Sequence, residues 1–260
     1  MVNIYVARHG QDVDNANGIL NGHRDEPLTD LGREQARDVA RKMVKAGMTL
    51  SSSSSYANTA SPSTAAATVL NAIYSSPLRR AHETAEIFAD ILSSSTGDLK
   101  GKHSLLPVDD SLSSPNVNTK PKVEILNDLI ERNFGVLTGQ PTSSILDNCR
   151  AEDILVTEKI NYFLHPPGAE TFPELIERAN RLLSDVQKIT ASDEDNDAAS
   201  SSILLVTHGD FGKMLYAAYY NLQWEEVLKQ FHFGNSEVLS LAKDSPPEKA
   251  HIFETSQFNS

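Results

Sequence analysis

Two histidines of this chain each follow a short apolar run and precede a glycine, and such a pair could supply a nucleophile and a second polar group to one site. His9 follows residues 3–8, and His208 follows residues 203–207. Apolar runs of this length that end at a glycine-marked turn are typical of buried strands. Because open α/β sheets bind ligands outside the carboxyl ends of their strands, we expect both histidines to lie at that edge.

Two further segments carry side chains with complementary chemistry. Arg79 and Arg80 follow a proline-containing turn, and arginine has a forked guanidinium group that donates hydrogen bonds to an anion. Glu131 falls in a predicted loop, where a partly dehydrated carboxyl group with a raised pKa can exchange a proton. Each residue alone also fits a structural role, such as a core histidine, a surface ion pair or an exposed carboxylate. The matching positions of the two histidines favour the functional interpretation.

The composition excludes several classes of protein. The net charge of −12 over 260 residues has the wrong sign for binding a nucleic acid backbone, and no basic stretch stands out. Cys149 is the single cysteine, so the sequence holds neither an internal disulfide framework nor a cysteine cluster for zinc. The sequence opens on an expected strand, without a signal peptide or a bilayer-spanning run. We therefore expect a cytoplasmic protein with neither a nucleic acid nor a membrane as partner.

The remaining patterns predict an α/β fold in a single domain over residues 1–260. Apolar runs between turn signals predict strands at residues 3–8, 69–74, 122–126, 203–207 and 237–242. Helical periodicity predicts helices at about 30–47, 79–92, 173–189, 211–220 and 224–231. Thr29 or Asp30 would cap the first helix. The alternation of strand and helix favours a mostly parallel sheet, although the last strand could be antiparallel.

Three serine-rich segments interrupt this pattern, at about residues 49–68, 93–120 and 191–202. Their composition buries too little apolar surface to offset the entropy of ordering, so we interpret them as low-complexity insertions without chemistry. Residues 11–29 read as a loop, and residues 141–165 as an ambiguous, partly helical region.

Short motifs recur in order along the chain: Arg8-His9-Gly10, Asn15, residues 22–36, Pro77-Leu78-Arg79-Arg80-Ala81, residues 131–139, residues 168–170, Val206-Thr207-His208-Gly209 and Asn235-Ser236. This ordered set resembles the histidine phosphatase superfamily, whose members include cofactor-dependent phosphoglycerate mutases and fructose-2,6-bisphosphatases. A lone Arg-His-Gly would be a weak signal, but the set covers everything except the three insertions. The resemblance specifies the fold further, as a three-layer α/β sandwich with a mostly parallel central sheet.

The resemblance also implies catalytic roles. His9 would be the nucleophile that forms a covalent phosphohistidine, His208 a hydrogen-bond donor, and Glu131 the proton donor. The implied substrate-binding positions are Arg8, Asn15, Gly22, Arg80 and Gly209. A turn-forming role for Asn15 and a surface ion pair for Arg8 remain open.

Two choices follow from the same pattern. The family motif Pro-Leu-x-Arg-Ala selects Arg80 rather than Arg79, which we expect to be solvated. Glu170 is expected to be structural or adjacent to the substrate rather than catalytic. The eight histidines show no compact ligand spacing and the arginines already supply positive charge, so we expect neither a metal nor another cofactor.

Asp12 departs from the family pattern, which usually has Thr or Ser at this position. A carboxylate near a bound phosphate would repel it unless the carboxylate were turned away or paired. We therefore assign no phosphate contact to Asp12, which could lower phosphate affinity or alter substrate choice.

The predicted function is a metal-independent phosphatase that acts on a small phosphorylated metabolite. A phosphoglycerate mutase is the first alternative, and residues 137–139 resemble mutases. Residues 140–167 contain Arg150 as their single arginine, however, and the sequence from Phe163 to Thr171 resembles metabolite phosphatases of the fructose-2,6-bisphosphatase type. A non-catalytic module that binds a phosphorylated ligand is the second alternative. Loss of a reacting residue would favour that module, and none of them is lost.

Overall fold

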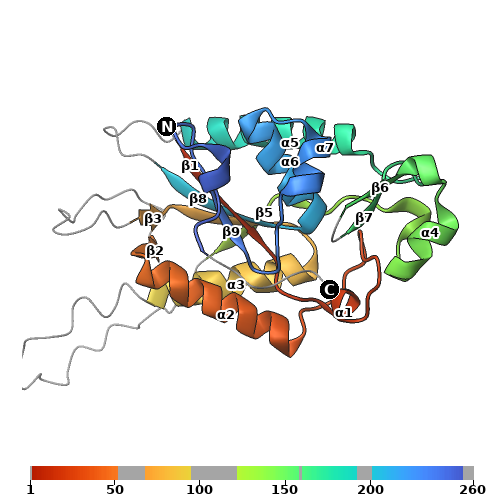
Figure 1. The fold of residues 1–260 in the computed structure, drawn as a ribbon. Coiled ribbons are helices and arrows are strands. Elements are labelled where there is room, and N and C mark those ends of the chain that lie inside the picture. The colour runs from red at the N-terminus through yellow and green to blue at the C-terminus, as the bar shows by residue number, and fades with distance from the viewer. Residues whose placement is uncertain (1, 52–67, 95–121, 158–159, 192–200, 254–260) are drawn as a thin grey trace, which may run out of the picture.

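Five strands form one central sheet in the order β5-β4-β8-β1-β9 (Figure 1). The computed structural model describes residues 2–51, 68–94, 122–157, 160–191 and 201–253. The strands of the sheet are β1 (Asn3–Arg8), β4 (Ala72–Ser75), β5 (Val123–Ile125), β8 (Ser202–Thr207) and β9 (Val238–Leu241). Strands β5, β4, β8 and β1 pair in parallel, whereas β9 runs antiparallel to β1. The predicted mostly parallel α/β sheet is therefore confirmed.

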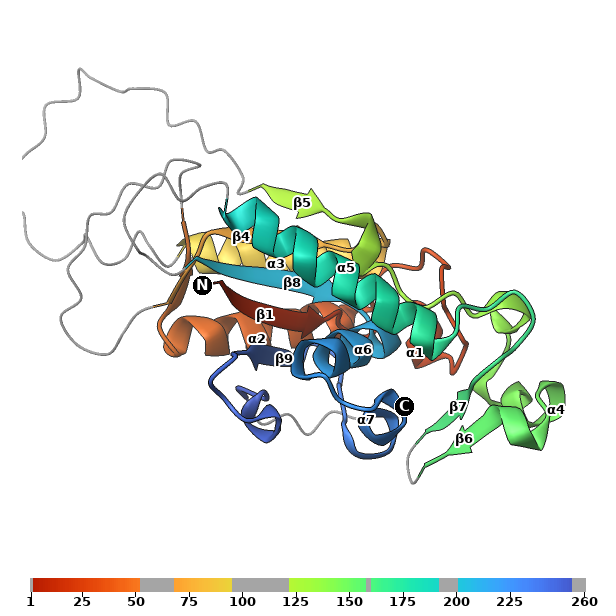
Figure 2. The same cartoon turned by 90° about the horizontal axis from the view of Figure 1, so that it is seen from above.

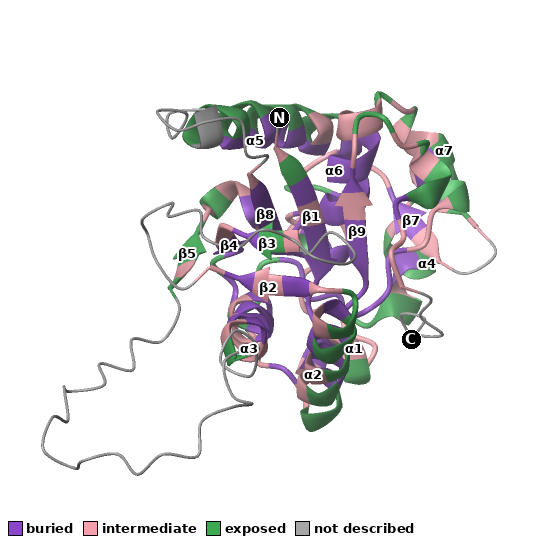
Figure 3. Cartoon of the chain, turned by 90° about the vertical axis from the view of Figure 1, so that its left-hand side faces the viewer, coloured by how far each residue is buried: buried purple, intermediate pink, exposed green. Residues whose placement is uncertain are grey.

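Helices cover both faces of this sheet (Figure 1). One face carries α2 (Asp30–Lys45) and α3 (Arg79–Ser94). The other carries α5 (Phe172–Ala191) and α6 (Gly209–Tyr220), with α7 (Trp224–Gln230) beside them. Successive side chains of a strand point to opposite faces, so Val6 of β1 packs in one core and Ala7 in the other. Figure 3 shows the buried strands between the outer helices, which is the predicted three-layer sandwich.

The shorter elements lie at the ends of the sheet. Strands β2 (Met48–Leu50) and β3 (Thr68–Leu70) pair in parallel as a separate small sheet. Helix α1 (Val13–Ala16) follows β1, while α4 (Ile145–Asn148) precedes an antiparallel pair formed by β6 (Ile154–Val156) and β7 (Asn161–Phe163). In Figure 2, α1, α4, β6 and β7 lie beyond the end at which β1 and β8 terminate. These segments therefore border the carboxyl edge of the sheet.

Two predicted elements were wrong in part. The expected loop at residues 11–29 contains α1, because an Asp12 side-chain oxygen accepts a hydrogen bond from the Asn15 N–H and caps a short helix. The expected strand at residues 69–74 divides at Asn71, since Leu70 pairs with Leu50 while β4 pairs with β8. The ambiguous region at residues 141–165 consists of α4, the β6–β7 pair and short 3₁₀ turns.

The expected insertions begin and end differently from the prediction. Residues 49, 50 and 68 belong to paired strands, residues 93 and 94 continue α3, and Ser202 begins β8. Composition alone treated these residues as linker, but strand pairing and helix continuation satisfy their backbone groups. Residues 52–67, 95–120 and 192–200 of the insertions lie outside the described residues. Among the described helices, none combines the length and the apolarity needed to cross a bilayer.

Candidate active site

His9 and His208 lie side by side at the carboxyl edge of the sheet. The pairing of β1 with β8 sets Arg8 opposite Thr207, and the His9 N–H donates to the Thr207 carbonyl at 3.0 Å. The centroids of the two rings are 5.0 Å apart, and the residues are 1% and 0% exposed. Parallel register thus brings together two histidines from opposite ends of the chain.

Hydrogen bonds fix the tautomer of His9. Its Nδ1 lies 2.6 Å from the Gly10 carbonyl oxygen, which can only accept, so Nδ1 carries the ring proton. Nε2 then carries the lone pair and accepts from Nε of Arg80 at 3.3 Å. Burial lowers the pKa of His9 well below its usual value, and the charges of Arg80 and Arg8 lower it further. The ring is therefore neutral, with the form that a nucleophile requires.

Arg80 is fixed by the loop that follows α1. Its Nη1 donates to the Arg24 carbonyl at 2.6 Å and its Nη2 to the Gly22 carbonyl at 2.8 Å. The residue is fully buried. Gly22 adopts a φ of 48°, and a Cβ there would lie 3.2 Å from the Phe134 ring. The contact of Gly22 with the site is thus made by its carbonyl, through Arg80.

Arg79 takes a different course from its neighbour. Its Nε donates to the Glu83 carboxylate at 2.7 Å, and its side chain is 58% exposed. The fold therefore brings Arg80, rather than Arg79, to the two histidines.

Arg8 and Gly209 lie on the other side of the histidine pair. Nη1 of Arg8 donates to the Phe233 carbonyl at 2.8 Å, and a Cβ on Gly209 would lie 3.3 Å from the guanidinium carbon. The same loop contributes Ser236, whose N–H donates to the His9 carbonyl at 3.1 Å. Ser236 has a φ of 57°, a conformation that is rare outside glycine and gathers at functional sites. Sequence reasoning matched Ser236 to the family without giving it a role.

His208 is oriented by a residue that sequence reasoning missed. Its Nε2 lies 2.7 Å from Oγ of Ser76, which also accepts from the Leu78 N–H at 3.2 Å. The Ser76 hydroxyl proton then finds its acceptor at Nε2, which leaves the ring proton of His208 on Nδ1. Burial lowers the pKa of His208 well below its usual value. His208 is therefore a neutral imidazole with a donor at Nδ1.

The Glu131 carboxylate sits at the N-terminus of α6. Its Oε1 accepts from the N–H groups of Phe211 at 3.1 Å and Arg132 at 2.8 Å, and its Oε2 from the Asp210 N–H at 3.3 Å. Burial raises the pKa of Glu131, the nearby Asp210 charge raises it further, and the backbone N–H groups oppose both. A carboxyl group in this environment can exchange a proton near neutral pH.

Arg178 of α5 holds the loop that carries Glu131. Its Nη1 donates to the carbonyls of Asp128 at 2.8 Å and Ile130 at 2.6 Å. Its Nε and Nη2 donate to the two carboxylate oxygens of Glu170 at 2.9 and 2.7 Å. Glu170 thus has the structural role considered for it. Arg178 was missed because its acceptors are backbone carbonyls 48 and 50 residues away, which leave no signal in the sequence.

Asn15 joins the site through its backbone. Its N–H donates to Oδ1 of Asp12 at 2.7 Å, and no described contact links its side chain to His9. Asp12 is fully buried, and its Oδ2 lies 3.2 Å from Nε of Arg80. The carboxylate that could have repelled a phosphate is therefore paired with a site arginine.

Several buried polar atoms near the histidines have no hydrogen-bond partner within the described part of the chain: His208 Nδ1, Asn235 Oδ1, Ser236 Oγ and Asn15 Oδ1. Buried polar groups nearly always have partners, and this mixture of donors and acceptors suits an oxyanion. In the described residues, no three His, Cys, Asp or Glu side chains converge as they would around a metal ion.

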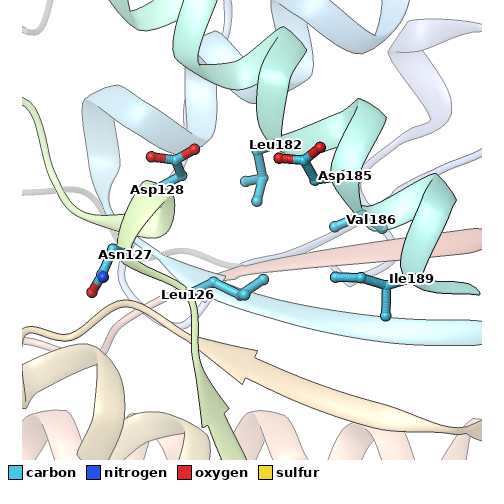
Figure 4. A pocket seen from close by; sticks show the side chains of 7 residues that line it. All are labelled: Leu126, Asn127, Asp128, Leu182, Asp185, Val186 and Ile189. Atoms are coloured by element: carbon cyan, nitrogen blue, oxygen red, sulfur yellow. The ribbon is translucent and has the colours of Figure 1, made fainter.

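A cavity of about 280 Å³ lies away from the histidines, between α5 and the segment after β5 (Figure 4). It is lined by Leu126, Asn127, Asp128, Leu182, Asp185, Val186 and Ile189. Two carboxylates and no basic side chain line this cavity, so its chemistry does not suit an anion. The anion-binding features of the described residues are those around His9.

Known proteins resemble this chain along most of its length. A relative from Hydrogenobacter thermophilus, named "Putative phosphoserine phosphatase 2", is 27% identical over 80% of this chain and 74% of its own. A 2,3-bisphosphoglycerate-dependent phosphoglycerate mutase of Bradyrhizobium diazoefficiens is 24% identical over 87% of this chain and 85% of its own. The solved structure of an Entamoeba histolytica phosphoserine phosphatase with 3-phosphoglyceric acid matches with a TM-score of 0.62 at 20% identity, covering 100% of this chain and 98% of its own.

The family described as the histidine phosphatase superfamily (branch 1) matches residues 4–70 and 116–246. These ranges contain His9, Glu131 and His208. Arg80 falls between them, and the fold brings it to His9. With this match over most of the sequence, the chain belongs to the histidine phosphatase superfamily.

Proposed function

We propose that this chain is a metal-independent phosphatase that hydrolyses small phosphomonoesters through a covalent phosphohistidine at His9. The tautomer of His9 carries this proposal. Nδ1 donates to the Gly10 carbonyl at 2.6 Å, and the lone pair of Nε2 lies beside the Arg80 guanidinium. A neutral nucleophile next to fixed positive charge is what attack on a phosphate ester requires.

In the first half-reaction, Nε2 of His9 attacks phosphorus while the ester P–O bond breaks. Arg8, Arg80 and the Nδ1–H of His208 hold the non-bridging oxygens, where charge accumulates. Glu131 gives its proton to the leaving oxygen, so the alcohol departs neutral. The phosphoryl group is then bound to a positively charged imidazole ring.

In the second half-reaction, water attacks the phosphorus and the N–P bond breaks. The Glu131 carboxylate takes a proton from the water, which returns Glu131 to its starting form. The bonding electrons return to Nε2, and inorganic phosphate leaves a neutral His9. The raised pKa of Glu131 supports this use of one group as acid and then as base.

A phosphoglycerate mutase is the second candidate, supported by the mutase relative at 24% identity. A mutase passes the phosphoryl group to a hydroxyl of a second acidic substrate rather than to water. Arg150, the single arginine of residues 140–167, has a 73% exposed side chain and pairs with Glu152 and Asp153. An arginine engaged in this way contributes little to a second anionic substrate, which favours water as the acceptor.

The substrate that this site suits is a small phosphorylated metabolite. Phosphoserine is the first candidate, because two similar proteins are named for its hydrolysis. We also propose that residues 1–260 fold as one domain, since the site draws on residues that follow β1, β4 and β8. A module that binds a phosphorylated ligand without reaction is left without a supporting observation, because all four reacting residues are present.

The test is phosphate release from phosphoserine, fructose 2,6-bisphosphate, the phosphoglycerates and an aryl phosphate, with a metal chelator present. We expect release by the wild type, none by His9→Ala, and wild-type rates for His82→Gln, a control on the same helix as Arg80. Isomerisation of 3-phosphoglycerate without hydrolysis would indicate the mutase instead. Silence in both assays would indicate the binding module.

A further inference from the structure

Asp12 places a negative charge inside a site built for anions. Its Oδ2 accepts from Nδ2 of Asn21 at 2.7 Å and lies 3.2 Å from Nε of Arg80. The same oxygen is 3.9 Å from Nδ1 of His9, while Oδ1 accepts from the Asn15 N–H at 2.7 Å. The side chain is 0% exposed. One buried carboxylate therefore touches both the attacking histidine and the arginine beside it.

The capping of α1 does not account for this charge. Ser, Thr and Asn cap helices about as well as Asp, so an uncharged side chain would serve the helix. Burying a carboxylate costs free energy unless a cation compensates. Here Arg80 is that cation, and burial raises the pKa of Asp12 while Arg80 opposes the rise. The charge has a structural cost and lies where charge moves during the proposed reaction.

We propose that Asp12 is a positioning residue that tunes the phosphoryl site in two opposite directions. This inference rests on the proposed function. Through Nδ1 of His9, the carboxylate supports the positive charge that the ring gains when Nε2 bonds to phosphorus. Through Arg80, it neutralises part of the charge that attracts the phosphate group.

The first effect follows from the geometry of the ring. When the N–P bond forms and the ester P–O bond breaks, Nδ1 keeps its proton and the imidazole becomes cationic. The Gly10 carbonyl at 2.6 Å and the Asp12 carboxylate at 3.9 Å then face this charge. In a buried environment a carboxylate at this distance lowers the energy of the cationic ring substantially. Asp12 therefore accelerates formation of the phosphohistidine.

The second effect acts on the substrate and the product. Arg80 already has a counter-ion at 3.2 Å, so a phosphate dianion meets a weaker net positive charge. Both the ester substrate and inorganic phosphate bind less tightly for this reason. Weaker product binding also frees the site for the next turnover.

The test compares Asp12→Asn and Asp12→Ser with the wild type, because both replacements can still cap α1. Asp38→Asn is the matched control, since it removes one carboxylate from an exposed site on α2 that pairs with Arg41. Affinity for inorganic phosphate is measured by calorimetric titration, which needs no turnover. Values of kcat and KM are measured with the best substrate of the panel, and thermal unfolding shows that each variant is folded.

We expect both Asp12 variants to bind inorganic phosphate about tenfold more tightly, with KM lowered similarly and kcat lowered about tenfold. Asp38→Asn should match the wild type. A merely structural role would raise KM as kcat falls, and that result overturns the proposal. Phosphate affinity within twofold of wild type in folded variants also overturns it. If the wild type hydrolyses nothing, the proposed function fails, and the phosphate titration still decides whether Asp12 weakens anion binding.

Discussion

The histidine site and the neighbouring segment of residues 141–165 hold their charges in different ways. Arg80 is fully buried and donates to the carbonyls of Gly22 and Arg24, more than 50 residues away in the sequence. Arg150 is 73% exposed and pairs with carboxylates two and three residues further along the chain. Figure 2 shows the second segment beyond the end of the strands, next to the site.

This difference separates chemistry from selectivity. Buried charges held by backbone groups stay in place without a ligand, so they can stabilise a transition state without reorganisation. Exposed charges with local partners are screened by water and contribute little. We therefore expect the largest mutational effects at the sheet edge and the smallest effects in residues 141–165, where loop variation can change the substrate.

Glu131→Gln should give the largest effect of the four variants below, a loss of kcat of roughly 10²–10⁴-fold for an alkyl phosphate. An aryl phosphate, whose leaving group needs no proton, should lose far less. Because burial raises the pKa of Glu131, its protonated form persists to higher pH, and wild-type kcat should fall as pH rises through that pKa. The variant should lack this decline. An unchanged pH profile of kcat would contradict the role.

Arg80→Lys tests whether a forked, buried cation is required. Lysine keeps the charge but cannot donate at once to two loop carbonyls and the His9 ring, so kcat/KM should fall about 10²-fold. Arg79→Lys is the matched control and should stay within twofold, since Arg79 is exposed. Steady-state kinetics of both variants provide the measurement. Equal losses in the two would break the comparison.

Arg178→Gln should have a smaller effect, because Arg178 acts through the loop that carries Glu131. We expect a loss of about tenfold in kcat, with KM within about threefold, as the loop becomes less ordered. Loss of the buried pair with Glu170 should also lower thermal stability. Glu170→Gln should reproduce part of both effects. A variant that loses stability but keeps full kcat would limit Arg178 to folding.

Arg150→Ala should have the smallest effect. Its exposed ion pairs contribute less than about 1 kcal/mol to stability. We expect kcat within twofold of wild type, and any change should appear in KM or in the order of preferred substrates. A loss of kcat comparable to that of Arg80→Lys would show that charges in residues 141–165 take part in the chemistry.

The central elements could be predicted from the sequence because their signals are local. Residues 3–8 and 203–207 are continuous apolar runs, so His9 and His208 could be assigned to strand ends. The N-cap at Thr29 and the turn before Arg80 are similarly readable within a few residues.

The remaining features depend on contacts between distant residues. The pairing of Met48 with Thr68 lies across a serine-rich stretch that hides it. Ser76 has no role until the turn after β4 meets His208, and Arg178 resembles any helix-surface arginine until α5 packs against the Glu131 loop. Asp12 could be identified as unusual from the sequence, but its pairing with Arg80 required the fold.

Trapping of the phosphoenzyme tests the central claim most directly. The enzyme is mixed with a ³²P-labelled substrate of the panel and quenched in alkali within milliseconds, then exposed to acid. We predict label on the wild type that survives alkali and is lost in acid, as a phosphohistidine requires, more label on Glu131→Gln with an aryl phosphate, and none on His9→Ala. Phosphate release by a wild type that never carries label, or label that persists on His9→Ala, would contradict the account.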